Sequence, residues 1–193
     1  MSDTKTVTYT GQGNFTIGSE SMFKAKDTGF IAQGGNMTVS SLEGDVELQG
    51  VRVRAAAEAT ATVISHRKDV ELVGGEISGR EIMIKGIDKV MLNAVDFVFT
   101  GNPVSSLLAI ESRTLVLHNI DLPADRPVRL KSELGLLAKN PNTRAATRNG
   151  YVNYYFGVTS GGVPAELLTV GSGVGVLPDA QRHITTLPIS PGQ

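Results

Sequence analysis

Short runs of alternating apolar and polar residues recur along the chain at a nearly constant spacing. The segments GDVELQGVRVRA (44–55) and KDVELVGGEISG (68–79) each contain an alternating run, a glycine and a second alternating run, and they are offset by 24 residues. Because successive side chains of a strand point to opposite faces, each run predicts a strand with one apolar face. The repetition predicts an array of similar structural units.

Three series of apolar pairs, each pair two residues apart, define the repeating unit. The first series is Val46/Leu48, Val70/Leu72, Val90/Leu92 and Leu115/Leu117. The second follows five residues later, as Val51/Val53, Gly75/Ile77, Val95/Phe97 and Ile120/Leu122. The third precedes the first by seven to nine residues, as Met37/Val39, Ala61/Val63, Ile82/Ile84 and Leu108/Ile110. The template also fits Phe15/Ile17, Phe23/Ala25 and Thr28/Phe30, so residues 15–122 are predicted to form five units of three short strands.

Strands this short cannot form an independent sheet, but stacked units bury each apolar row against the next. The chain is therefore predicted to be all-β, a single-stranded right-handed parallel β-helix (β-solenoid) of about five three-strand coils with a C-terminal cap and tail. An antiparallel β-sandwich is the alternative, since it also uses short strands separated by turns. Gly50, Gly74, Ala94 and Asn119 fall at one recurring corner, where Ala94 fits least well. Unequal spacing places insertions at 55–60 and 100–106, which are expected to project as loops.

The solenoid is expected to span residues 1–138 with an N-terminal capping strand, and residues 139–193 are expected to add a polar loop, an aromatic cap strand and an extended tail to the same unit. A solenoid has open strand edges at its ends, which must be capped or paired. The N-terminal segment TVTYT is β-prone and carries neither charge nor proline to discourage pairing. The candidate self-association residues are Thr6, Val7, Thr8, Tyr9 and Thr10 there, Tyr151, Tyr154, Tyr155 and Phe156 in the aromatic strand, and Leu187 and Ile189 in the tail.

Composition narrows the partners that the chain is expected to have. Its 18 basic and 19 acidic side chains nearly cancel, so it lacks the basic surface typical of nucleic-acid binding. No apolar stretch approaches the length of a membrane span, and no secretory signal is visible, so no membrane insertion is expected. The absence of cysteine excludes disulfides, thiolate metal sites and thiol nucleophiles.

One face of the predicted solenoid stacks carboxylates. The residue between the members of the second pair is Arg52, Glu76, Asp96 and Asp121 in successive coils, which would place three carboxylates about 4.8 Å apart. Glu76, Asp96 and Asp121 are candidate ligands of a Ca²⁺ ion, because Ca²⁺ binds carboxylate oxygens. The competing interpretation, favoured here, is a solvated face neutralised by Arg52 and other basic residues, with no metal and no cofactor.

The units at 44–55 and 68–79 resemble the degenerate repeats of filamentous-haemagglutinin-type adhesins and related bacterial surface β-helix proteins. The resemblance covers residues 36–122 and implies a bacterial, surface-associated, non-catalytic rod, without identifying a receptor. The sequence thus favours an extracellular or cell-surface structural protein that forms a homo-oligomer or filament through its ends, with a glycan or host surface as a further possible partner and the cytoplasm as the alternative location. The alternative function is a polysaccharide lyase, hydrolase or glycan-binding module that uses the carboxylate face.

Overall fold

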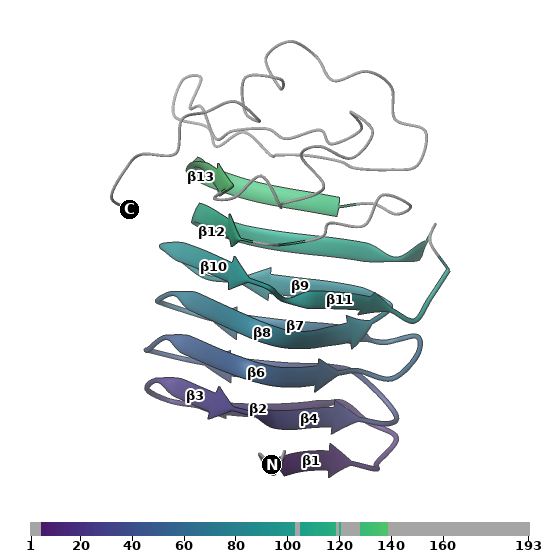
Figure 1. The fold of residues 1–193 in the computed structure, drawn as a ribbon. Coiled ribbons are helices and arrows are strands. Elements are labelled where there is room, and N and C mark those ends of the chain that lie inside the picture. Colours follow the sequence, from purple (N-terminus) through teal and green to yellow (C-terminus); the bar gives the residue numbers. More distant parts are fainter. Residues whose placement is uncertain (1–4, 103–104, 119, 121–127, 139–193) are drawn as a thin grey trace.

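A computed structural model describes residues 5–102, 105–118, 120 and 128–138, which form a stack of β coils (Figure 1). The strands are β1 (Lys5–Tyr9), β2 (Phe15–Ser19), β3 (Phe23–Lys26), β4 (Thr28–Ala32), β5 (Met37–Ser41), β6 (Val46–Arg54), β7 (Thr60–Ser65), β8 (Val70–Gly79), β9 (Glu81–Lys85), β10 (Lys89–Asn93), β11 (Asp96–Phe99), β12 (Leu107–His118) and β13 (Val128–Ala138). Within this part of the chain, no helix is long and apolar enough to cross a membrane.

The strands line three faces that run along the axis of the stack. Face A consists of β2, β5, β7, β9 and the first half of β12. Face B consists of β3, the first halves of β6 and β8, β10, and the second half of β12. Face C consists of β1, β4, the second halves of β6 and β8, and β11. The last strand, β13, lies over β12 and therefore adds one further layer to faces A and B.

Every pairing between described strands is parallel, and neighbours in space are one coil apart in the sequence. The registers match the predicted series: Val46 pairs with Val70 and Val70 with Val90, while Met37 pairs with Ala61. The predicted β-solenoid of about five coils is confirmed. The antiparallel sandwich is wrong, because a coil that returns to the same face after each turn can pair only in parallel.

The core is made of the apolar rows that the repeat predicted. Side chains of the middle coils are almost wholly buried, and the largest of these are Met37, Leu72, Ile77, Ile82, Ile84, Leu92, Leu108, Ile110, Leu115, Leu117 and Ile120. Burying one such aliphatic side chain contributes about 1.5–3 kcal/mol. Stacked rows of this kind stabilise the rod without long helices or disulfides.

The corner between faces B and C has a left-handed backbone in every described coil. Gly50 and Gly74 have φ of 61° and 65°, and Asp27 and Ala94 adopt the same conformation with φ of 47° and 53°. β6 and β8 continue through this corner from one face to the next. In β8 a second residue, Gly75, also has a positive φ, of 89°. Ala94 therefore occupies the predicted corner despite being a poor residue for it, and Asn119 lies outside the described residues.

Buried serines satisfy backbone groups at the corner between faces A and B. Buried Ser65 donates its hydroxyl to the Gly44 carbonyl in the coil below (2.8 Å) and accepts a hydrogen bond from the Lys68 amide (2.9 Å). Ser41 makes the equivalent pair of bonds, to the Ser21 carbonyl and from the Gly44 amide. These side chains supply partners for turn groups that would otherwise be buried and unpaired.

Candidate functional site

The N-terminal end of the solenoid leaves several apolar side chains incompletely covered among the described residues. Val7 and Tyr9 of β1 are 43% and 37% exposed, and Met22 in the next turn is 41% exposed. In register, Val7 lies under Phe30 and Tyr9 under Ala32, so β1 continues the inward-facing rows of face C to the very end. The apolar rows of the core thus reach the surface here.

Faces A and B also begin with half-covered side chains. Phe15 and Ile17 of β2 are partly buried, whereas Met37 and Val39, the next residues in their rows, are fully buried. The difference arises because each row is covered by the coil above and, within the described residues, by no coil below. Burial of these side chains against another surface would supply the favourable free energy for association at this end.

The edge of β1 is ordered by local packing. The Tyr9 ring stacks on Phe15 with centroids 5.2 Å apart, and the Gln33 amide donates to the Tyr9 carbonyl at 2.9 Å. A Cβ at Gly11 would lie within 3 Å of the Tyr9 side chain, so a larger residue there would require the Tyr9 ring to move. On its outer side β1 is the last strand of the sheet among the described residues, so its second set of backbone groups is available to another strand (Figure 1).

The remaining candidate self-association residues divide into two groups. Thr6, Thr8 and Thr10 are exposed beside Val7 and Tyr9 at this end. The others lie outside the described residues: Tyr151, Tyr154, Tyr155, Phe156, Leu187 and Ile189. The structure therefore brings together the N-terminal members of the predicted set.

The carboxylate face is assembled as the register predicted. Asp96 lies directly above Glu76, and Glu76 directly above Arg52, while Asp121 lies outside the described residues. The Arg52 Nε is 3.7 Å from the Glu76 carboxylate, and both side chains are substantially exposed. No group of three or more His, Cys, Asp or Glu side chains in the described part of the chain is arranged to hold a metal ion. The observed contacts favour an ion-paired, solvated face.

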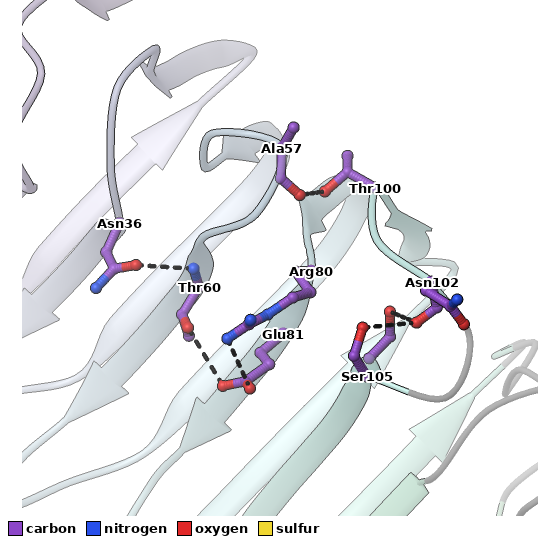
Figure 2. Close-up of polar contacts among 9 residues, drawn as sticks. Asn36, Ala57, Thr60, Arg80, Glu81, Thr100, Asn102 and Ser105 are labelled. Carbon is purple, nitrogen blue, oxygen red and sulfur yellow. Dashed lines mark hydrogen bonds and ion pairs between the residues drawn. The ribbon is translucent and has the colours of Figure 1, made fainter.

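The two insertions meet at the corner between faces C and A, as Figure 2 shows. The Thr100 hydroxyl donates to the Ala57 carbonyl, which joins the two loops. Below them, Arg80 Nη2 lies 3.1 Å from Glu81, and the other oxygen of that carboxylate accepts from the Thr60 hydroxyl at 3.3 Å. Sequence reasoning missed this network, because Thr60 and Glu81 lie 21 residues apart and Ala57 and Thr100 lie 43 residues apart, and they become neighbours only through the coil period.

This network has a structural role, because its polar groups are engaged with one another. The Arg80 Nε is buried and has no hydrogen-bond partner among the described residues, and a Cβ on Gly101 would lie 2.6 Å from the Arg80 side chain. The guanidinium is thus held under the second loop by packing and by its ion pair with Glu81. Arg80 therefore supports the contact between the two loops.

Two shallow concavities lie on the sides of the rod. The larger, of about 500 Å³, lies over face B and is crossed by an ion pair of 2.8 Å between Lys24 and Glu47. The smaller, of about 340 Å³, lies beside the 55–60 insertion and contains Arg54 and Thr100. Neither brings together a nucleophile with a base, or a pair of carboxylates free of cationic neighbours.

Comparison of the chain with protein-family models, with curated proteins and with solved structures found no match. The resemblance to filamentous-haemagglutinin-type repeats therefore remains a prediction from the repeat itself. The fold defines the class of protein, a parallel β-solenoid, and function has to be argued from its surfaces.

Proposed function

We propose that this protein is a non-catalytic structural subunit that self-associates through the ends of its solenoid into a filament or surface fibre. The observation that carries the proposal is the end formed by β1, where an outer strand edge and the exposed side chains of Val7 and Tyr9 lie together. Strand addition to an open edge supplies backbone hydrogen bonds, and the apolar rows supply buried area.

The sides of the rod differ from the N-terminal end, and this difference supports the proposal. Their charges are largely engaged in ion pairs between successive coils, such as Lys24 with Glu47 and Lys85 with Glu111 at 3.6 Å. The sides also expose single apolar side chains, such as Leu42 (51%) and Met83 (40%), whereas Val7 and Tyr9 at the N-terminal end continue the inward-facing rows of the core. An extracellular or cell-surface location and an adhesin-like role fit a rod of this kind and belong to the same proposal.

The test is the association state of the full chain as a function of concentration. Light scattering should show mass growing beyond the 20.4 kDa monomer, and negative-stain microscopy should show rods longer than one subunit. Val7→Lys should reduce association, because it places a charge among the apolar rows at the end. Val98→Lys is the matched control, since Val98 is equally exposed (42%) but lies on β11, the described strand of face C that is farthest from the N-terminal end.

A protein that remains monomeric at all accessible concentrations, without fibres, would contradict the proposal. Equal loss of association in the two lysine variants would show that solubility, and not the end surface, governs the effect.

A further inference from the structure

One arginine on the side of the rod has no ionic partner among the described residues. Arg52 on face C pairs with Glu76 in the coil above, because the two occupy one outward row. Arg54 occupies the next outward row, where its neighbours are Ile31 below and Ser78 above. Neither neighbour carries a charge, and the Arg54 guanidinium makes no ion pair within the described part of the chain.

Arg54 lines the smaller of the two concavities, which has a volume of about 340 Å³. Sites for small molecules typically have volumes of roughly 300–1,000 Å³, so the space is sufficient for a small ligand. Three of the lining residues are the consecutive alanines 55–57, whose small side chains leave the concavity open. Among the described residues that line it, Arg54 is the one charged side chain. The concavity therefore presents a cation without a carboxylate to neutralise it.

Hydrogen bonds hold the rim of this concavity in place. The Ala56 amide donates to the Gly35 carbonyl at 3.0 Å, and the Ala59 amide donates to the Ala56 carbonyl at 3.0 Å. The Thr100 hydroxyl donates to the Ala57 carbonyl and so joins the second loop to the first (Figure 2). A site built on segments that are already ordered loses less conformational entropy when a ligand binds.

Two further polar side chains, Thr8 and Gln33, line the concavity and are exposed. Neither side chain makes a hydrogen bond within the described part of the chain. A hydroxyl and a carboxamide each donate and accept hydrogen bonds, so both suit the hydroxyl groups of a ligand. A guanidinium instead presents a planar fork of donors that matches the two oxygens of a carboxylate.

We infer that this concavity binds a hydroxylated carboxylate of the sugar-acid class, such as a uronic acid. Arg54 would bind the carboxylate, and Thr8 and Gln33 would bind its hydroxyl groups. An extended acidic peptide suits the surface less well, because Ile31 and Arg54 lie on β4 and β6, which are paired along both edges and cannot accept another strand. The inference goes beyond the proposed function and does not depend on self-association, since the concavity lies on the side of the rod.

Saturation-transfer NMR observed on the ligand tests the site, because the method is suited to weak binding by a monomer or by a filament. The probe is glucuronic acid, titrated at neutral pH against the full chain. A shallow site with one charged contact is expected to bind it with a Kd on the order of 1 mM. Glucose and the methyl ester of glucuronic acid, which lack the carboxylate, should bind at least about tenfold more weakly.

Variants of the two neighbouring arginines separate the site from the general charge of this face. Arg54→Gln should weaken the binding of glucuronic acid at least about tenfold, and Arg54→Lys should restore only part of it, because an ammonium lacks the planar fork. Arg52→Gln is the matched control, since Arg52 is exposed on the same face but is paired with Glu76, and it should leave the Kd unchanged. Ala57→Leu should also weaken binding, because it fills the concavity without changing its charge. Melting temperatures establish that each variant is folded.

Each other outcome overturns the inference in a distinguishable way. Equal losses in Arg52→Gln and Arg54→Gln would show attraction to the face as a whole, without a site. Propionate binding as tightly as glucuronic acid would refute the sugar-acid class, and tighter binding of an acidic peptide would assign the concavity to a protein partner. Fibres without saturation transfer to glucuronic acid would refute this site while the proposed self-association stands. Binding by a chain that remains monomeric would refute the self-association alone.

Discussion

Ala94 has the same left-handed backbone conformation as Gly74, the residue that occupies the equivalent corner one coil earlier, with φ of 53° and 65°. The left-handed region costs a residue with a Cβ about 1–2 kcal/mol, and glycine enters it freely. The coil period therefore imposes a conformation on Ala94 that its own chemistry disfavours. The stacked apolar rows on both sides of the corner compensate for that cost.

Ala94→Gly is expected to stabilise the protein by about 0.5–1 kcal/mol. Relief of the left-handed strain exceeds the added backbone entropy that glycine brings to the unfolded chain. Urea denaturation of the two proteins measures the difference as a shift in midpoint. An unchanged or lower midpoint would show that Ala94 is not strained at this corner.

Replacing the two adjacent glycines of the corner one coil earlier, Gly74 and Gly75, should separate conformational strain from steric overlap. In Gly74→Ala the new Cβ would find its nearest atoms in Gly50, at 3.9 Å and beyond, so only the left-handed cost of about 1–2 kcal/mol applies. In Gly75→Ala it would lie 2.2 Å from the Val51 carbonyl oxygen. The second variant should be destabilised severely, to the point of losing the cooperative transition, and similar midpoints for the two would contradict the register of this corner.

Ser65→Ala is expected to destabilise the protein by about 1–3 kcal/mol, because it leaves the Gly44 carbonyl and the Lys68 amide without their side-chain partner. Ser112→Ala is the matched control. Ser112 is also buried, but its hydroxyl has no hydrogen-bond partner among the described residues. Its removal should be neutral or slightly stabilising by thermal melting. An equal loss in both variants would mean that the ladder bonds of Ser65 contribute nothing beyond side-chain volume.

The sequence predicted the coils well because the core of a solenoid is strictly periodic. Rows such as Val46, Val70 and Val90 obey one rule, and the structure places them in one register. The corners were harder, since a corner is defined by backbone conformation and can be filled by Gly74, Ala94 or Asp27 alike. Of the candidate end surface, only the strand TVTYT could be predicted from the sequence. Its exposure depends on what covers the rows of Phe15 and Phe23, and no local pattern encodes that.

Asp69 links three successive coils, and its replacement by alanine or by asparagine should lower the free energy of unfolding by different amounts. Its Oδ1 accepts from the Lys89 amide at 2.9 Å, and its own amide donates to the Asp45 carboxylate at 3.1 Å. Asp69→Ala removes the acceptor and should cost about 1–2 kcal/mol. Asp69→Asn keeps a carbonyl oxygen in place and should cost less than half as much, as Asn36 performs the same task for the Thr60 amide. Equal urea midpoints for the two variants would show that Asp69 stabilises the protein through its charge and not through the hydrogen bond that its Oδ1 accepts.

Calcium at millimolar concentration is expected to leave the melting temperature unchanged. The Arg52 guanidinium already lies beside Glu76, and Asp96 adds only one more carboxylate among the described residues, whereas Ca²⁺ takes about six to eight oxygen ligands. Arg52→Ala should change the free energy of unfolding by less than about 0.5 kcal/mol, because an exposed ion pair contributes little. A calcium-dependent rise of several degrees that disappears in Glu76→Gln/Asp96→Asn would instead establish a metal site on this face, since only a bound ion would make those two carboxylates stabilising.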